Sequence, residues 1–339
     1  MSHKSPRARR QAITVTSNHK SAKMCAMRYN SILEAIGHTP LVEMANLSPH
    51  KGVRIFAKLE GNNLGGSASV KDRIAKYMIE KAEQSGELTP DKTILEATSG
   101  NTGIALAMIG HMKGYKVKIA MPDNVSLERR QLIELYGAEL ILTEGAKGVD
   151  ASIELVNEIM ARNGSYFMPD QFSNSDNPQA HYETTGAEIL QALPDLDIDA
   201  LVCGLGTGGT MMGVGKRIKE RNPKVKLIGV EPYPDEAIEG LRCLAKGYAP
   251  AVLDVNLLDQ RAMVRRADAI AALGELLQRE GIFAGLSSGA AIFQTLNIAQ
   301  EMERGNIVVI LPDGGWKYLS LGIDIWSKGR APIAPSAEV

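Results

Sequence analysis

A glycine-rich loop is the strongest chemical signal in this chain of 339 residues. In "VCGLGTGGTMMG" an apolar run ends at Gly204 and a helical pattern follows, so backbone N–H groups gather at a helix N-terminus and favour a bound phosphate. The loop also matches the dinucleotide fingerprint Gly-x-Gly-x-x-Gly, and Glu231 stands where a ribose-binding acid belongs, so an NAD-binding dehydrogenase is an alternative. A tight turn without a ligand is a further alternative. The candidate phosphate-binding residues are Gly206, Thr207, Gly208, Gly209 and Thr210.

A second loop, "EATSGNTGIALA", places hydroxyl and amide groups directly before an apolar helix. Its polar residues are Thr98, Ser99, Asn101 and Thr102. Crowded around exposed helix N–H groups, these side chains suit a small carboxylate. A helix cap formed by Ser99 or Thr102 is an equally good explanation of the loop taken alone.

A third loop, "FAGLSSGAA", copies the spacing of the α/β-hydrolase nucleophile elbow, Gly285-x-Ser287-x-Gly289. That catalytic triad needs a histidine after the serine, and no histidine follows His181. The hydrolase interpretation is therefore excluded. Ser287 is either a helix N-cap or a hydrogen-bond partner for a bound ring.

The elements that must position these loops are short apolar runs alternating with longer helical patterns. The expected strands are "VRIFAKLE", "TILEAT", "KVKIAMP", "AELILT", "ALVCGLG", "KLIGVEP" and "NIVVILP". Strands that alternate with helices pair in parallel through right-handed crossovers, which predicts an α/β, doubly wound fold. In such a fold ligands bind beyond the carboxyl ends of the strands, where all three loops begin.

A lysine completes the set, because "NNLGGSASVKDR" leads a polar loop into a helical pattern at Lys71. Alone, this lysine would be a solvated charge at a helix terminus. Together, a phosphate cradle, a carboxylate cradle and a lysine suit pyridoxal phosphate, whose aldehyde needs a lysine and whose amino-acid substrate carries a carboxylate. A dehydrogenase explains only the first loop.

Composition narrows the function class. The 38 Lys and Arg residues balance 39 Asp and Glu residues, which argues against a nucleic-acid partner, and no apolar run is long enough to cross a membrane. Three widely spaced cysteines and six histidines match neither a disulfide framework nor a metal motif, so we expect a reducing cytoplasm and no metal. The basic residues 1–27 predict a flexible tail, with an organelle transit peptide as the alternative.

With these residues assembled, the chain resembles the β-family (fold type II) pyridoxal phosphate enzymes, and within them the cysteine synthases, especially type B. The resemblance covers about residues 30–326 and implies a tryptophan synthase β-like architecture of two doubly wound domains. It depends on eight motifs in family order: "IGHTPLV", "SVKDR", "ATSGNTGIALA", "ERRQLIELYGAELILT", "DQFSNSDNPQAHYETTGAEI", "GLGTGGT", "EGIFAGLSSGAA" and "KYLS".

The resemblance implies a role for each candidate residue. Lys71 would hold the cofactor as an internal aldimine and act as general base, Asn101 would contact the ring hydroxyl, and Ser287 would face the pyridine nitrogen. Residues 206–210 would bind the cofactor phosphate. The substrate carboxylate would bind Thr98, Ser99, Thr102 and Gln171.

The implied reaction forms L-cysteine from O-acetyl-L-serine and sulfide, or another thiol donor, through an α-aminoacrylate intermediate. Arg242 falls where some type B relatives carry an arginine near the substrate tail, so O-phosphoserine is an alternative donor, and an exposed structural charge is an alternative role for this arginine. A cystathionine β-synthase and a serine or threonine dehydratase are further alternatives on this scaffold. The family also implies a homodimer.

Two features of the loop before Lys71 depart from the family pattern. Leu64 stands where proline is usual, and "SASVK" carries two extra residues, which we expect to bulge away from the cofactor.

The polar stretch 169–182 predicts the domain boundary. We expect an N-terminal domain over 28–175, whose first strands can pack on the other domain, a C-terminal domain over 176–330, and a tail over 331–339.

Overall fold

The computed structural model describes residues 28–98, 100–246 and 249–321. The chain divides into two compact units, Met1–Asn30 and Ser31–Val339, and all that follows concerns the second unit. The predicted tails at 1–27 and 331–339 lie outside the described residues. Among the residues that are described, no helix combines the length and the apolar character needed to cross a bilayer.

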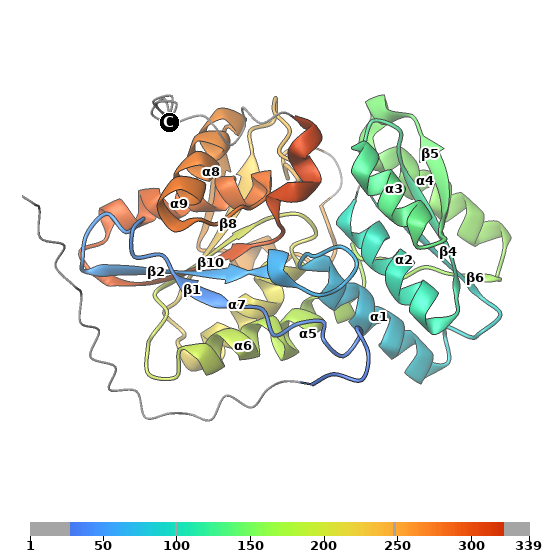
Figure 1. The fold of residues 1–339 in the computed structure, drawn as a ribbon, viewed down its shortest axis with the longest axis horizontal. Coiled ribbons are helices and arrows are strands. Elements are labelled where there is room, and N and C mark those ends of the chain that lie inside the picture. The colour runs from blue at the N-terminus through green and yellow to red at the C-terminus, as the bar shows by residue number, and fades with distance from the viewer. Residues whose placement is uncertain (1–27, 99, 247–248, 322–339) are drawn as a thin grey trace, which may run out of the picture. The chain divides into compact units, whose positions relative to one another are not determined.

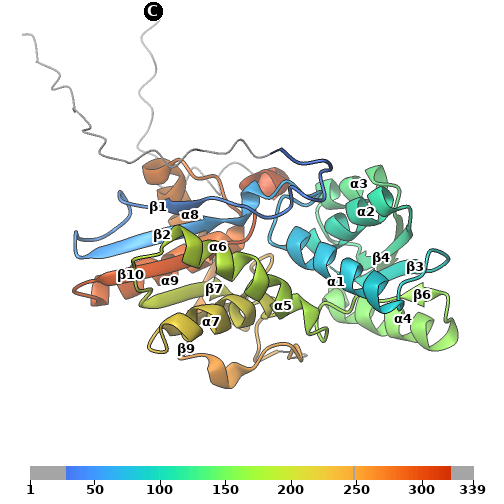
Figure 2. The same cartoon turned by 90° about the horizontal axis from the view of Figure 1, so that it is seen from below.

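The larger sheet has six strands in the order β1-β2-β10-β7-β8-β9 (Figures 1 and 2). Only the β1–β2 pair is antiparallel, and the other pairs are parallel. Its strands are β1 (Leu41–Glu43), β2 (Val53–Leu59), β7 (Ala200–Gly204), β8 (Lys226–Pro232), β9 (Gln260–Val264) and β10 (Gly305–Leu311).

The smaller sheet has four parallel strands in the order β5-β4-β3-β6. Its strands are β3 (Thr93–Ala97), β4 (Lys116–Pro122), β5 (Glu139–Thr143) and β6 (Tyr166–Phe167). The predicted α/β class with mainly parallel sheets is therefore confirmed. The first two strands of the chain belong to the larger sheet, and the domain boundary between residues 175 and 176 stays a prediction.

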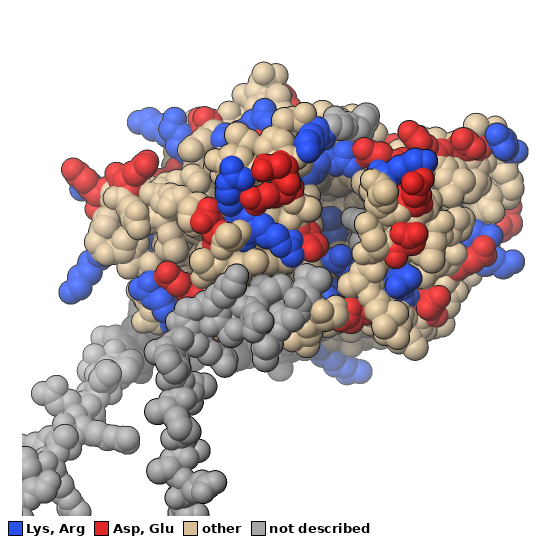
Figure 3. All heavy atoms as spheres, turned by 90° about the horizontal axis from the view of Figure 1, so that it is seen from above, with Lys and Arg blue, Asp and Glu red and all other residues tan. Residues whose placement is uncertain are grey.

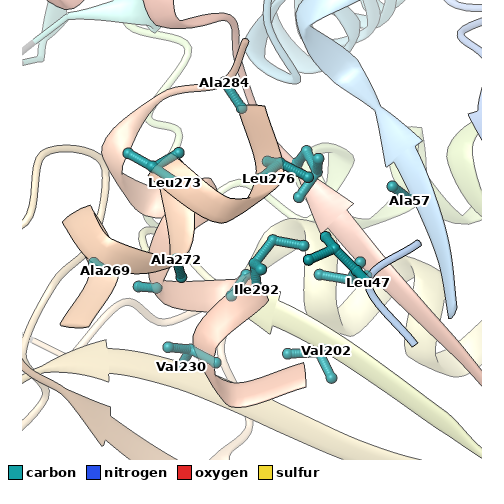
Figure 4. Packing of buried hydrophobic residues seen from close by; sticks show 14 of the residues in the cluster. Leu47, Ala57, Val202, Val230, Ala269, Ala272, Leu273, Leu276, Ala284 and Ile292 are labelled. Atoms are coloured by element: carbon teal, nitrogen blue, oxygen red, sulfur yellow. The ribbon is translucent and has the colours of Figure 1, made fainter. Parts of the chain in front are cut away.

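Helices cover both faces of each sheet, as a doubly wound fold requires. On the larger sheet, α8 (Arg266–Glu280) and α9 (Leu286–Glu301) pack on one face, and α6 (Thr185–Ala192) and α7 (Gly209–Arg221) pack on the other. Figure 4 shows the first of these cores, where side chains of α8 and α9 gather against Val202 and Val230 of the sheet.

On the smaller sheet, α1 (Lys71–Ser85), α2 (Asn101–Lys113) and α3 (Leu127–Leu135) share one core, and α4 (Gly148–Arg162) packs on the opposite face. The helix α5 (Asp176–Glu183) contacts both α1 and α7 and so joins the two halves of this unit. A short 3-10 helix, η4 (Gly315–Leu321), follows β10.

Candidate active site

A cavity of about 590 Å³ lies at the carboxyl ends of strands from both sheets. This is the size range of small-molecule sites and the edge at which doubly wound folds bind ligands. In the space-filling view the surface is hollowed and basic side chains gather at the hollow (Figure 3). Most of the predicted site residues line the cavity: Lys71, Thr98, Asn101, Thr102, Gln171, Gly206, Thr207, Gly208, Thr210, Arg242 and Ser287. Gly209 is not part of this lining, and Ser99 lies outside the described residues.

The glycine-rich loop ends at the N-terminus of α7, where Gly208 adopts a left-handed backbone with φ of +87°. Only glycine adopts this conformation without strain. Gly209 is required for a different reason, because a Cβ atom there would lie 1.9 Å from Oδ1 of Asn177. The two glycines thus leave the first turn of α7 bare, with its N–H groups and the positive end of its dipole directed at the cavity.

Two side chains of α5 support this loop from behind. Asn177 donates from Nδ2 to the Thr207 hydroxyl at 3.0 Å and to the Gln171 carbonyl at 2.7 Å. The ring of His181 contacts the hydroxyl of Thr210 at 3.2 Å, and burial keeps the pKa of this histidine well below its usual value. Sequence reasoning missed both residues, although their spacing of four on a buried helix places them on one face.

Buried side chains support the loop that follows β3 and contains Thr98 and Thr102. Thr102 donates to Oε1 of Gln171 at 2.7 Å, and the backbone of Gln171 rests on Glu96. Burial raises the pKa of Glu96 to about 8, and repulsion from Asp170 adds to this effect. The Thr98 hydroxyl accepts from the backbone N–H of Gly100 at 3.3 Å. Thr98 and Thr102 therefore have partners within the protein and lie at the cavity wall.

Lys71 is the first residue of α1 and is half-buried at the cavity wall. Burial lowers the pKa of its amine, the Asp313 carboxylate opposes this only in part, and Lys317 lowers it further. A lysine in such a place is a better nucleophile and base at neutral pH than a solvated one.

The two extra residues before Lys71 are Ser67, which is buried, and Ala68, which is partly buried. Ser67 and Ser69 are fully buried, and their backbone N–H groups donate to Asp72 at 3.0 and 2.9 Å. The Ser67 carbonyl accepts from the buried Lys317 amine at 2.6 Å. Neither serine lines the cavity, so this segment forms a support beneath the start of α1.

Asp313 is a further side chain of the site that sequence reasoning missed. It is buried, lines the cavity, and accepts from Asn101 Nδ2 at 2.9 Å and from the Tyr318 hydroxyl at 2.7 Å, while the Lys317 amine lies 3.5 Å away. The signal in the sequence is its position two residues after the end of the buried parallel strand β10. Asp313 orients the Asn101 amide and places a negative charge near Lys71.

Ser287 and Arg242 lie on the side of the cavity formed by the larger sheet. Ser287 is buried in the first turn of α9. Arg242 is largely buried, with 13% of its side chain exposed, and its Nη2 lies 3.2 Å from Oδ1 of Asp150. Its guanidinium also lies over the ring of Phe172, 5.3 Å from the centroid. The prediction that Arg242 faces the substrate region is thus compatible with the geometry, but a carboxylate already contacts it.

The cavity fits pyridoxal phosphate better than a dinucleotide. The bare turn of α7 suits a phosphate, Lys71 suits an aldehyde, and Oδ1 of Asn101 is buried without a partner among the described residues, as a ligand contact would explain. The dinucleotide interpretation needs Glu231 for a ribose. That carboxylate is buried, accepts from the Leu244 N–H at 2.7 Å and pairs with Arg261 at 2.7 Å. Its oxygens are therefore already bound within the protein, which argues against a contact with a ribose.

Comparisons with known proteins agree with this interpretation. The family model described as "Pyridoxal-phosphate dependent enzyme" matches residues 32–313. A cysteine synthase from Staphylococcus aureus is 42% identical over 299 residues, which cover 86% of this chain and 96% of that protein. Cysteine synthase B from Escherichia coli is 43% identical over 294 residues, covering 87% and 96%.

A solved structure extends the likeness to the fold. The structure of cysteine synthase (OASS) from Entamoeba histolytica superposes with a TM-score of 0.81 at 38% identity and covers 94% of each chain. The family model spans most of the described chain, and the curated relatives are similar over almost their whole length. This chain belongs to the pyridoxal-phosphate dependent enzyme family.

Proposed function

We propose that this chain is a cysteine synthase, which replaces the β-substituent of an activated serine with sulfide to form L-cysteine. The observation that carries the proposal is the convergence of Lys71, the first turn of α7 and the Thr98–Thr102 loop on one cavity. The similarity to cysteine synthases over almost their whole length supports the same reaction class. O-Acetyl-L-serine is the donor we propose first.

The residues around this cavity would hold the cofactor at four places. Lys71 would bind it covalently, Asn101 would contact the ring hydroxyl, Ser287 would lie at the ring nitrogen, and residues 206–210 would bind its phosphate. When bound, pyridoxal phosphate withdraws electrons from the α-carbon of the amino acid it carries, so that a β-substituent is able to leave. Ser287 has a neutral hydroxyl, which does not hold the ring nitrogen protonated as a carboxylate would, and this favours β-replacement over transamination.

Lys71 has a second task once the substrate amine has taken its place. Because burial lowers the pKa of its amine, this lysine gives up its proton more readily than a solvated lysine and is better suited to remove the α-proton as general base. The nearby Asp313 carboxylate limits that lowering, so the amine is still able to hold the proton it has taken. Lys71 would therefore both accept a proton and return to its covalent partner at the end of the cycle.

The substrate carboxylate would bind the second loop. Thr98, Ser99 and Thr102 supply hydroxyl and N–H donors, and Gln171 closes the other side through its contact with Thr102. Since Thr102 and Gln171 already contact each other, these two side chains need little ordering when the substrate binds. We extend the proposal to a homodimer in the cytoplasm, which the family resemblance supports and which size-exclusion chromatography with light scattering would test.

The covalent role of Lys71 is tested by borohydride reduction of the purified holoenzyme followed by peptide mass spectrometry. We expect the reduced cofactor on the peptide that contains Lys71, and no covalently attached cofactor after reduction of Lys71→Ala. Lys76→Ala, on the same helix, is the matched control and should retain the covalent attachment. A modified peptide from elsewhere in the chain, or covalently attached cofactor in reduced Lys71→Ala, would refute the assignment.

The reaction itself is tested by incubating the holoenzyme with sulfide and either O-acetyl-L-serine or O-phospho-L-serine and measuring cysteine. O-Phosphoserine is the second candidate donor because Arg242 lines the cavity, and its planar fork suits phosphate. We expect cysteine from at least one of the two donors. Cysteine from neither donor, with the cofactor present, would contradict the proposed function.

A further inference from the structure

An ion pair between Arg242 and Asp150 joins two segments at the cavity that are far apart in sequence. Arg242 lies in the segment between β8 and β9, and its backbone N–H donates to the Leu205 carbonyl at 2.7 Å, directly before the phosphate loop. Asp150 lies in the first turn of α4. Gly148 and Val149, the two residues before Asp150, line the cavity, so this carboxylate lies at the cavity edge.

The two members of the pair differ in how firmly they are placed. The Arg242 side chain is 13% exposed and packs over the Phe172 ring, whereas the Asp150 side chain is 51% exposed. A half-exposed carboxylate is hydrated in any position and loses little when it leaves its partner. The arginine is therefore the fixed member and the aspartate is the exchangeable one.

A carboxylate on a guanidinium occupies the place that a substrate oxyanion would take. Arginine binds carboxylate and phosphate through the same N–H groups, so both cannot use the contacting Nη2 group fully at once. A phosphate ester must displace Asp150 and also approach its negative charge. An acetyl ester carries no charge at this end and meets neither cost.

We propose that Asp150 competes with the anionic end of the substrate for Arg242 and so sets the preference between a neutral and a phosphorylated serine donor. This inference rests on the proposed cysteine synthase function. The side chain at position 150 then acts as a specificity-determining residue without touching the reacting atoms. With aspartate present, the pair disfavours O-phosphoserine relative to O-acetylserine, and removal of the carboxylate shifts the preference toward phosphate.

The test compares Asp150→Asn with Glu154→Gln, which removes one negative charge from the same helix one turn further along. Steady-state rates are measured with sulfide and each donor. For Asp150→Asn we expect the KM for O-phosphoserine to fall on the order of two- to fivefold, the range set by partly exposed ion pairs, with kcat unchanged. The KM for O-acetylserine should stay constant, and Glu154→Gln should match the wild type with both donors.

Arg242→Ala provides the second part of the kinetic test, because it removes the group for which Asp150 and the substrate phosphate compete. In the double variant Arg242→Ala/Asp150→Asn the gain with O-phosphoserine should vanish. A gain that persists without Arg242, or an equal gain in Glu154→Gln, would show a general effect of charge and overturn the inference.

A binding measurement keeps this test separate from the proposed function. Inorganic phosphate is titrated into each holoenzyme by calorimetry, which needs no turnover. We expect tighter phosphate binding in Asp150→Asn than in Glu154→Gln by a similar factor, and no difference once Arg242 is absent. Equal phosphate affinity in Asp150→Asn and Glu154→Gln would overturn the inference even if cysteine is formed, whereas absence of cysteine with a clear difference in phosphate affinity would contradict the proposed function alone.

Discussion

Replacing Arg73 with methionine should destabilise the protein more than any change to a surface charge, because this arginine holds two buried carboxylates. Arg73 lies two residues after Lys71 on α1 and is almost fully buried. Its guanidinium donates to both oxygens of Glu60 at 2.7 and 2.9 Å and to both oxygens of Glu188 at 2.7 Å. The buried Lys58 amine also contacts Glu188, at 2.6 Å.

The magnitude follows from Glu188. Burial by itself would raise the pKa of this carboxyl, but Arg73 and Lys58 outweigh burial and lower the pKa from 4.5 to about 2. A carboxyl whose pKa is lower in the folded state stabilises the fold above pH 4.5, and this contribution is lost as the pH falls from 4.5 toward 2. The difference in pKa corresponds to about 3 kcal/mol. Removing one partner of a buried ion pair costs about 3 to 5 kcal/mol, so we expect Arg73→Met to lose that much at neutral pH.

Urea denaturation followed by far-ultraviolet circular dichroism measures this loss at pH 7.5 and pH 5. The deficit of Arg73→Met should shrink at pH 5, because Glu188, without Arg73 to lower its pKa, then takes up a proton and no longer leaves an uncompensated charge. Arg54→Met is the matched control, since Arg54 pairs with Glu43 at 2.7 Å with both side chains about 40% exposed. That exposed pair should cost at most about 1 kcal/mol. A loss in Arg73→Met no larger than in Arg54→Met, or one independent of pH, would refute the reasoning.

Two further predictions concern Glu96 and Gly209, which support the residues that line the cavity. Because burial raises the pKa of Glu96 to about 8, with Asp170 adding to the shift, its ionisation opposes folding and the wild type loses stability as the pH rises from 4.5 toward 8. The urea midpoint of Glu96→Gln should therefore rise relative to that of the wild type between pH 5.5 and pH 8. A difference in midpoint that stays constant over this range would contradict the prediction. In Gly209→Ala the new methyl group would lie 1.9 Å from Oδ1 of Asn177, so cofactor affinity, titrated by absorbance, should fall on the order of tenfold to a hundredfold. Gly164→Ala, where an added Cβ meets nothing within 4 Å, should bind the cofactor normally.

The central strands were predictable because parallel strands between two helical layers are buried on both faces and read as continuous apolar runs. All seven expected runs contain strands of the structure. The three missed strands, β1, β6 and β9, are edge strands of the two sheets. β9 buries only alternate residues, and β6 has two residues, so neither offers an apolar run to detect.

The candidate site was predictable where backbone geometry dictates the residue type. Gly208 must adopt a left-handed backbone and Gly209 must leave room for Asn177, so both positions are marked by glycine in the sequence itself. Asn177 and Asp313 left no such mark. Each supports another side chain through a hydrogen bond between residues that are at least 30 positions apart in sequence, such as the 2.9 Å bond between Asp313 and Asn101.

The sequence alone determined the alternation of strands and helices, the loops that follow the strands, and the lysine that stands at the start of a helix. These features depend on local hydrophobic periodicity and on backbone conformation, which neighbouring residues express directly. Only the tertiary structure decided that Ser67 and Ser69 before Lys71 are buried supports and that Asp150 lies against Arg242, 92 residues further along the chain. Charge pairing and burial act through space, so they are set only when the crossover connections of a doubly wound fold bring distant segments together.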